Sequence, residues 1–216
     1  KEVLESEGYH IISLDENAKL RIREGKDAFI SRNGNWVREG VIYIPKKGNK
    51  LVRNSPILYS AKEATQAHRE GKEFYPSKEA IDKALEDSID FPTKNTEIPT
   101  NRFNENELTV WAFGNSAQAY GDFLKDSKIN KIPTWVVGKD YVNQQSSPFV
   151  RQLWFGGLDY RSVLDGGSGS LHIDNRVRGV LQAAEGSEAA PKISDSKLKA
   201  YTPEEIVHYS SLVKDV

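Results

Sequence analysis

The stretch Phe155–Asn175, with the sequence FGGLDYRSVLDGGSGSLHIDN, bears most directly on the fold and function of this chain. It contains no Lys, Glu, Gln, Met or Trp, although Lys and Glu are abundant elsewhere. Its polar residues are types that recognition surfaces favour, because Tyr and His give rigid contact area and Asn, Ser and Asp give adaptable hydrogen bonds. Its glycines allow backbone angles that other residues rarely adopt. The composition favours a binding surface; the alternative interpretation is an ordinary glycine-rich surface loop.

The segments on either side of this stretch have the pattern of a packed scaffold. Residues 152–154 (QLW) precede it, and residues 176–180 (RVRGV) follow it. Loops that carry function are commonly held by rigid elements of this kind. We expect residues 176–181 to form a central, buried strand, and the arrangement favours binding over catalysis.

The composition of the whole chain sets broad limits. Its 216 residues fit one large domain, or one domain with an extra element. A net charge of −1 disfavours nucleic acid as the partner, and no apolar run approaches membrane-spanning length. The absence of cysteine excludes disulfides, thiolate metal sites and a cysteine nucleophile. Because the chain does not begin with Met, we expect it to be trimmed, with any signal segment lost.

The N-terminal part has a strand-like pattern. Short runs of β-branched and aromatic residues, separated by turn residues, predict strands at residues 9–12, 19–22, 28–31, 36–37 and 40–44. Asn33-Gly34 is a candidate hairpin turn, and another turn is expected at residues 47–49. We expect residues 1–50 to form a β-rich segment packed on a main domain of residues 51–182.

The middle of the chain alternates helices and strands. Ser60 and Glu63 form a capping-box pattern before a helix at 61–70. Ser77 precedes a helix at 78–88, and Asn115 or Ser116 precedes one at 117–126. Strands are predicted at residues 107–113, 132–137 and 150–154. Beyond the main domain, residues 182–197 have linker composition, and Thr202-Pro203 begins a helix that extends to about Lys214, so that 183–216 is a linker and helix.

The usual catalytic and nucleotide-binding motifs are absent from the sequence. Gly166–Gly169 lacks the strand-to-helix context of a phosphate loop, and the four histidines are scattered: His10, His68, His172 and His208. Solvated side chains are the expected state of Asp159, Asp165 and Asp174, rather than acid/base or calcium-binding roles. Core packing is expected for each of the four tryptophans: Trp36, Trp111, Trp135 and Trp154. We therefore predict no catalytic residue, no metal ion and no cofactor.

Several short motifs and their spacing point to a known family. They comprise residues 149–154 (FVRQLW), Leu158, Arg161-Ser162, Leu164, Gly166, Leu171 and residues 176–180, together with upstream residues 61–71, 73–77 and 114–124. Over residues 57–180 this pattern resembles the variable proteins of diversity-generating retroelements, particularly archaeal and archaeal-virus members. The resemblance implies a C-type lectin fold of α+β class, with a mixed short-stranded sheet, two to three helices and an irregular loop-rich ligand face.

The resemblance also implies a mechanism for the unusual composition. In this family template adenines are miscopied, so that Asn codons are converted into others. Changing only the first two bases of AAC or AAT cannot produce Lys, Glu, Gln, Met or Trp, which are the five types missing from residues 155–175. The family's variable region, here about residues 153–180, usually ends the protein, whereas this chain continues past Val180. No calcium-ligand motif of the carbohydrate-binding C-type lectins is visible, and fold alone does not fix function.

A fold that accepts many sequences at one face should hold its stability elsewhere. The expected scaffold residues are Trp154, Leu158, Arg161, Leu164, Leu171, Arg176 and Arg178, with Leu153, Val177 and Val180 as further inward anchors. The expected exposed, ligand-binding and variable residues are Phe155, Gly156, Gly157, Asp159, Tyr160, Val163, Asp165, Gly167, Ser168, Gly169, His172, Ile173, Asp174 and Asn175. Tyr160 is expected at the centre of the surface.

The function implied is recognition of an unknown protein or glycan ligand, for example on a host cell, by a protein on a virion or cell surface. Two alternatives remain open at this point. One is a structural module of a virion with a passive glycine-rich loop. The other is an enzyme on a related fold, although oxidases of the formylglycine-generating type need thiols that this chain lacks.

Overall fold

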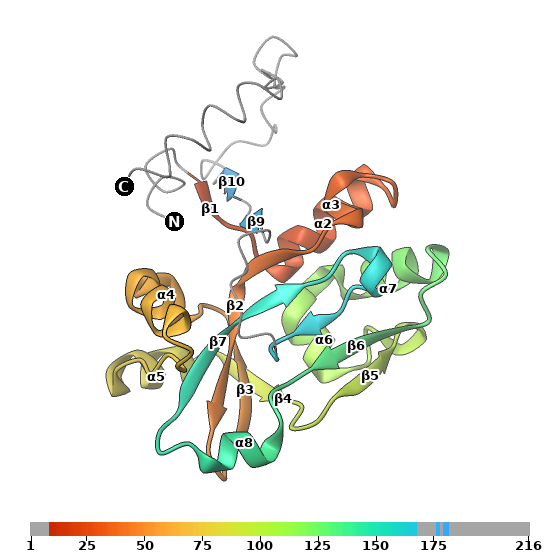
Figure 1. Ribbon diagram of the computed structural model, residues 1–216. Coiled ribbons are helices and arrows are strands. Elements are labelled where there is room, and N and C mark those ends of the chain that lie inside the picture. The colour runs from red at the N-terminus through yellow and green to blue at the C-terminus, as the bar shows by residue number, and fades with distance from the viewer. Residues whose placement is uncertain (1–8, 168–175, 178, 182–216) are drawn as a thin grey trace. The chain divides into compact units, whose positions relative to one another are not determined.

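The centre of the fold is a mixed sheet built around strands β2 (Asn35–Ile44) and β7 (Phe149–Phe155) (Figure 1). The computed structural model describes residues 9–167, 176, 177 and 179–181. The strand order is β4-β3-β2-β7-β8-β6-β5, and β9 pairs with β2 beside this path. The remaining strands are β3 (Gly48–Val52), β4 (Ser88–Phe91), β5 (Thr96–Pro99), β6 (Lys131–Trp135), β8 (Leu164–Asp165) and β9 (Arg176–Val177).

Strand β2 combines two of the expected strands and joins them through a bulge. Its register with β7 shifts between Trp36 and Gly40. β2 turns into β3 at residues 45–47; Lys46 in this turn and Gly48, the first residue of β3, take positive φ angles of 63° and 107°. The expected turn near residues 47–49 is thus confirmed, as are strands near residues 9–12, 132–137 and 150–154.

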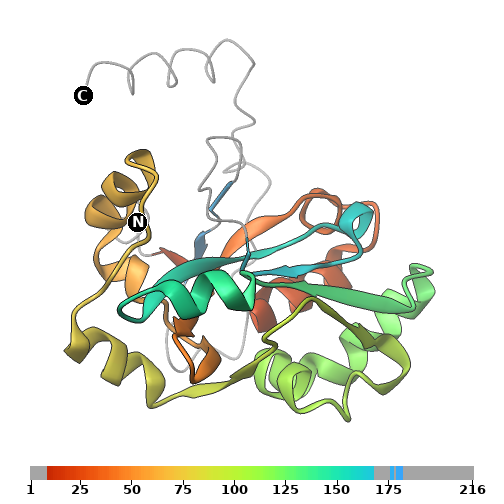
Figure 2. The same ribbon diagram turned by 60° about the horizontal axis from the view of Figure 1, so that its bottom comes forward.

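One face of the sheet is covered by α2 (Leu14–Glu24), α6 (Glu107–Phe113) and α7 (Ala117–Asp126) (Figures 1 and 2). Their apolar side chains form the main core with those of β2, β7 and β8. The α7 helix was predicted, but the strands expected at residues 19–22 and 107–113 are wrong. Ser13 and Glu16 form a capping box that begins α2, and the Asn106 side chain accepts from Thr109 N at 3.1 Å to begin α6.

The expected strand at residues 28–31 and the hairpin at Asn33-Gly34 are also wrong. Residues Phe29–Arg32 form the short helix α3, which ends at Asn33. Gly34 is instead a close-packing position, because a Cβ there would lie 2.1 Å from Cζ2 of Trp154. Within residues 9–50, helices α2 and α3 thus accompany strands β1 and β2 and the first residues of β3.

The other face of the sheet packs against α4 (Ala61–Arg69) and α5 (Lys78–Leu85), both of which were predicted. A second core of six buried residues joins them to the sheet: Ile42, Val52, Ile57, Ala64, Ile81 and Val150. Ser77 caps α5 by accepting from Ala80 N at 3.2 Å, whereas Ser60 makes no capping side-chain bond, so the capping box predicted there is wrong. The remaining short elements are α8 (Lys139–Gln144) and the 3-10 turns η1 (Pro56–Tyr59), η2 (Thr100–Arg102) and η3 (Gly114–Ser116).

The described residues of the strand expected at 176–181 belong to two different sheets. Strand β9 pairs with two residues of β2, and β10 (Gly179–Leu181) pairs with β1 (Tyr9–Ile11) in a separate two-stranded sheet. The alternating sequence therefore serves two short strands with different partners. The compact unit that contains the sheet ends at Leu181. The linker and helix expected at residues 182–214 lie outside the described residues.

Candidate ligand-binding face

The first half of the unusual stretch forms a tightly closed loop at residues 156–167, which follows β7 and includes the two-residue strand β8. After Gly157 the chain makes the 3-10 turn η4 (Leu158–Tyr160), and Arg161 and Ser162 then adopt left-handed φ angles of 52° and 53°. Backbone bonds close the loop: Gly156 N donates to Val163 O at 2.9 Å, and Ser162 N donates to Gly157 O at 3.0 Å. The 156–167 loop is therefore a defined structure rather than an extended excursion.

A buried arginine binds this loop from the interior of the protein. Arg21 of α2 donates hydrogen bonds to Tyr120 Oη at 3.0 Å and to Ser162 Oγ at 3.2 Å, and those two hydroxyls lie 3.0 Å apart. Its Nε also donates to the Ile30 carbonyl at 3.1 Å, and its guanidinium lies 4.1 Å from the centre of the Phe155 ring. A buried polar group needs such partners to offset its lost hydration. The side chain of Ser162 is thereby fixed where the loop adopts its least favourable backbone angles.

Five of the positions expected to be exposed are instead buried, so those expectations are wrong. Phe155 and Val163 are 0% exposed and Asp165 is 3% exposed; Gly156 and Gly157 are also buried. Phe155 packs between Phe113 and Tyr120 of the helical layer. A Cβ at Gly157 would lie 2.2 Å from the Arg32 carbonyl oxygen, and one at Gly156 would lie 2.6 Å from Val163 Cγ1. Close packing leaves no room there for varied side chains.

Two of the expected binding residues are exposed, and one is partly exposed. Tyr160 is 59% exposed and Asp159 is also exposed, while Gly167 is half-buried. The Tyr160 and Trp154 rings form an edge-to-face pair, with ring centres 5.7 Å apart. The other expected binding residues lie outside the described residues: Ser168, Gly169, His172, Ile173, Asp174 and Asn175.

The expected scaffold residues likewise include buried residues, an exposed one and some that lie outside the described residues. Leu164 is fully buried in the main core, against which Leu158 packs, and Trp154 is half-buried. Arg161 is exposed and pairs with Glu97 of β5 at 2.8 Å. Leu171 and Arg178 are outside the described residues, and Arg176 is described only as part of β9.

The end of the 156–167 loop is anchored by groups from distant elements. Tyr43 Oη donates to Gly166 O at 2.9 Å, and burial raises the pKa of this tyrosine. Gly167 N donates to Asp165 Oδ1 at 2.8 Å, and Arg151 donates to the carbonyl of Gly167. The backbone is therefore held as far as the last described residue of this segment.

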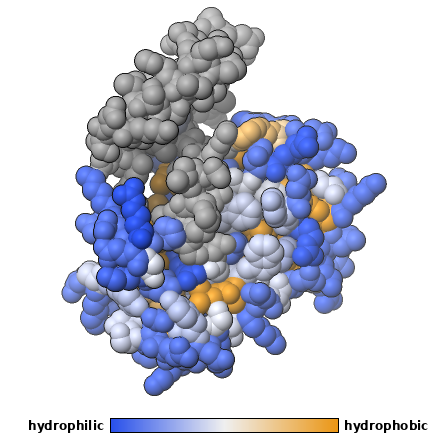
Figure 3. Space-filling view, in the orientation of Figure 1, coloured by the Kyte–Doolittle hydropathy of each residue, from blue (hydrophilic) through white to orange (hydrophobic). Residues whose placement is uncertain are grey.

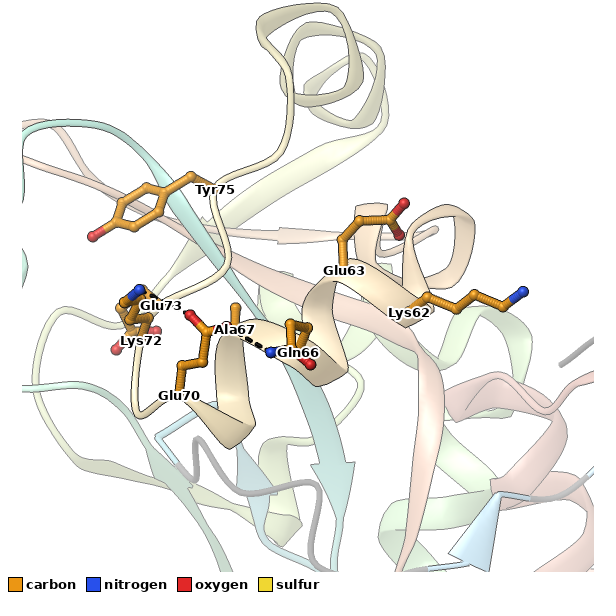
Figure 4. A pocket seen from close by; sticks show the side chains of 8 residues that line it. All are labelled: Lys62, Glu63, Gln66, Ala67, Glu70, Lys72, Glu73 and Tyr75. Carbon is orange, nitrogen blue, oxygen red and sulfur yellow. Dashed lines mark hydrogen bonds and ion pairs between the residues drawn. The ribbon is translucent and has the colours of Figure 1, made fainter. Parts of the chain in front are cut away.

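Arg151 also connects the loop to a hollow on the α4 side of the protein. Its Nε donates to Glu73 Oε2 at 3.2 Å, and Tyr141 donates to Glu73 Oε1 at 3.0 Å. Glu73 lines an open hollow of about 700 Å³, whose other lining residues are Lys62, Glu63, Gln66, Ala67, Glu70, Lys72 and Tyr75 (Figure 4). Glu70 bonds both Gln66 and Lys72 there. Several of the polar side chains that line the hollow are therefore hydrogen-bonded to one another.

A buried carboxylate lies at the bulge of β2. Glu39 is fully buried, and its two oxygens accept the N–H of Leu14, the first residue of α2, at 3.2 and 3.1 Å. Burial raises the pKa of Glu39 to about 7, against the opposing effects of the Leu14 hydrogen bond and of Arg38 and Arg53.

Among the residues that the structure describes, no group of three or more His, Asp or Glu side chains could hold a metal ion.

Comparison with known proteins identifies the architecture. No protein-family model and no curated protein matches the chain. Among solved structures, a protein of Nanoarchaeota studied for the accommodation of massive sequence variation by the C-type lectin fold matches with a TM-score of 0.57. The match covers 78% of this chain and 87% of that chain, at 19% identity. This chain has the C-type lectin fold. At this level of identity the likeness shows the fold alone.

The C-type lectin fold of this chain contains more helices than the two or three expected. It confirms the α+β class. Sequence reasoning missed Arg21, because the residues around it were assigned to a strand, and it missed the exposure of Trp135, which is 39% exposed at the end of β6.

Most of the described surface in Figure 3 is hydrophilic. No helix among the described residues is both long and apolar enough to cross a bilayer.

Proposed function

We propose that this protein binds a protein or glycan ligand on a host or partner surface through a face centred on Tyr160. Asp159 and Gly167 complete the described part of this face. Ser168, Gly169, His172, Ile173, Asp174 and Asn175, which lie outside the described residues, are part of the proposal as well. The protein would act at the surface of a virion or a cell.

The observation that carries the proposal is an exposed tyrosine on a fixed turn. The 59% exposed Tyr160 ring lies two residues before Ser162, which the buried Arg21–Tyr120 pair holds in place. A rigid support lowers the entropy lost when an aromatic side chain is immobilised by a partner. Side chains beside such a support can change with little effect on folding, because the stabilising contacts lie beneath them.

We further propose that this face is diversified by a retroelement. Four residue types that Asn codons cannot give by changes in their first two bases are missing from residues 155–175 although they occur elsewhere in the chain; the fifth, Met, is absent throughout. The structure with the same fold was studied for massive sequence variation, which supports the proposal by analogy. Because Phe155, Gly156, Gly157, Val163 and Asp165 are buried, the proposal restricts diversification to the exposed positions.

Two displayed libraries of the full chain test the binding proposal. The face library varies Asp159, Tyr160, Gly167, Ser168, Gly169, His172, Ile173, Asp174 and Asn175 with codons that end in C or T. The control library varies the same number of exposed positions on α4 and α5, for example Lys62, Glu63 and Lys78. Both are selected against an immobilised unrelated protein such as lysozyme. We expect binders from the face library only; none from it, or equal numbers from both, would favour a passive structural loop.

The neighbouring DNA tests diversification separately. We expect a near-identical repeat of the region that encodes this face, with adenines at the codons of the exposed positions, beside a reverse transcriptase gene. If no such repeat exists, diversification is refuted while the binding result stands. If the repeat has adenines at the Phe155 and Val163 codons as well, the restriction to exposed positions is wrong.

A further inference from the structure

A pocket of about 250 Å³ lies where the β2–β3 turn, α8 and the segment after β4 meet. Three of its lining residues are the exposed lysines Lys46, Lys47 and Lys139, and its described lining includes no Asp or Glu. The remaining lining residues are neutral: Ile44, Gly48, Asn49, Thr93, Val142 and Asn143. The lining of this lysine pocket therefore carries three positive charges and no negative one.

Hydrogen bonds join the elements around the lysine pocket, and α8 lies at the end of β2 and β3 (Figure 1). The backbone N–H of Lys46, in the turn, donates to Asn143 Oδ1 of α8 at 2.8 Å. The Asn49 side chain of β3 donates from Nδ2 to the Pro92 carbonyl at 2.6 Å, which holds the segment that carries Thr93. The walls of the pocket come from three separate parts of the sequence and are bonded directly to one another.

The lysine charges of this pocket are not neutralised by carboxylates within the described part of the protein. The ion pairs there use other lysines, namely Lys19, Lys50, Lys72, Lys78, Lys125 and Lys131. Of the acidic residues closest to the pocket in sequence, Asp90 pairs with Lys50 at 2.7 Å, and Asp140 is exposed outside the lining. Like charges that line one pocket repel each other, so an anion placed among them lowers the electrostatic energy.

Uncharged donors accompany the lysines. Because Asn143 Oδ1 accepts from Lys46, the Nδ2 of Asn143 still has hydrogens to donate, and Thr93 adds a hydroxyl. A phosphate monoester carries about two negative charges at neutral pH and has three strong acceptor oxygens. Lysine binds phosphate as a point charge. Carboxylates and sulfate monoesters carry a single negative charge, so the charge and the donors of the pocket favour a phosphate monoester.

The lysine pocket and Tyr160 lie at opposite ends of β7. Lys139 and Asn143 precede this strand, whereas Tyr160 follows it. At about 3.4 Å per residue, the strand spans about 20 Å. A group bound in the pocket therefore does not cover Tyr160, and the lining residues lie outside residues 155–175.

We propose that the lysine pocket binds a phosphate monoester, with Lys46, Lys47 and Lys139 supplying charge and Asn143 supplying an uncharged donor. This site is additional to the function proposed above and does not depend on it. Because the three lysines are exposed, water and salt screen their charges. The affinity for a small probe is therefore on the order of millimolar.

Titration of the full chain with methyl phosphate tests the site. Methyl sulfate is the matched probe, because it has the same shape but a single negative charge. Both are added at about pH 7.5 and constant ionic strength, and the backbone amide signals of the β2–β3 turn and α8 are followed in NMR spectra. We expect methyl phosphate to bind with a dissociation constant on the order of millimolar, and methyl sulfate to bind at least about threefold more weakly. Equal binding of the two probes, or no binding of methyl phosphate, overturns the proposal.

A triple variant locates the site. The combined changes Lys46→Gln, Lys47→Gln and Lys139→Gln should weaken the binding of methyl phosphate at least about tenfold. Thermal unfolding shows whether the variant is folded. If it is not, Lys139→Gln alone replaces it, with an expected loss of about threefold. Unchanged binding by the folded variant overturns the proposal.

A control variant separates the pocket from the general charge of the protein. Lys26→Gln, Lys62→Gln and Lys128→Gln remove the same number of charges at exposed positions outside the pocket. Salt screens charges at such a distance, so binding should stay within about twofold of the parent. An equal loss in both triple variants overturns the proposal. Selection of binders from the face library would still support the proposed function, so the two failures are distinguishable.

Discussion

Arg21 donates a hydrogen bond from its Nη1 to Ser162 Oγ at 3.2 Å, and this bond joins residues 141 positions apart in the sequence. It connects the first long helix to the turn that presents Tyr160. A buried guanidinium with hydroxyl, carbonyl and aromatic partners thus supports the proposed binding face from the interior. The contribution of Arg21 to the free energy of unfolding can be measured by replacing it, because the groups that it contacts stay in the protein.

Arg21→Met should destabilise the protein by about 2–4 kcal/mol, because it removes the hydrogen bonds that Arg21 donates to two buried hydroxyls and to a buried carbonyl. Urea unfolding measures this change. Arg23→Met is the matched control: Arg23 lies on the same helix, is largely exposed and pairs with the adjacent Glu24, so its loss should change stability by less than about 0.5 kcal/mol. Equal effects of the two changes would contradict the role assigned to Arg21.

Gly157→Ala should be strongly destabilising, by about 3 kcal/mol or more, because the new Cβ would lie 2.2 Å from the backbone oxygen of Arg32. Gly138→Ala is the comparison: it has open space around its Cβ position and a φ angle of −57°. Its cost as a helix cap should stay within about 1 kcal/mol. Thermal unfolding of both proteins measures the difference. A Gly157→Ala protein as stable as the parent would return Gly157 to the set of variable positions.

Two aromatic residues of the same stretch should respond in opposite ways to the same change. Phe155→Ser should cost about 4 kcal/mol, because it removes a ring from the core. Tyr160→Ser should cost about 1 kcal/mol or less, since only its edge-to-face contact with Trp154 is lost. Denaturant midpoints compare the two. If both changes are tolerated, the 156–167 loop is not supported in the way described.

The sequence predicted the fold class and several elements, and the reasons differ between elements. Helices α5 and α7 have apolar residues at helical spacing on one face, a pattern that is visible in the local sequence. In α2 and α6, the few residues around Arg21 and Trp111 include β-branched or aromatic types, and they were therefore predicted as strands. The N-caps Ser13 and Asn106 instead begin helices there.

The candidate face was predictable in part for similar reasons. The exposure of Tyr160 follows from local composition. The burial of Phe155 follows only when β7 extends to residue 155, because alternation then places it on the same side as Phe149 and Leu153. The contact between Arg21 and Ser162 depends on tertiary packing, and no local pattern contains it.

Glu39 should make the protein less stable as the pH rises from about 4.5 to about 7. Its pKa is raised from 4.5 to about 7 in the folded state by burial. Between these values the folded state binds more protons than the unfolded state, so the free energy of unfolding falls with rising pH. The stabilising effect is fully present below pH 4.5 and is lost as the pH passes through about 7, with a total on the order of 3 kcal/mol.

Glu39→Gln isolates this effect, because an amide of the same shape does not titrate. We expect the difference in unfolding free energy between the parent and Glu39→Gln proteins to move in favour of the variant by about 3 kcal/mol from pH 4.5 to pH 8. Glu63→Gln, at an exposed position on α4, should give a nearly constant difference over the same range. Urea unfolding at half-unit pH steps measures all three proteins. If the parent and Glu39→Gln curves run parallel, Glu39 is ionised in the folded protein throughout this range, and its burial does not couple folding to pH.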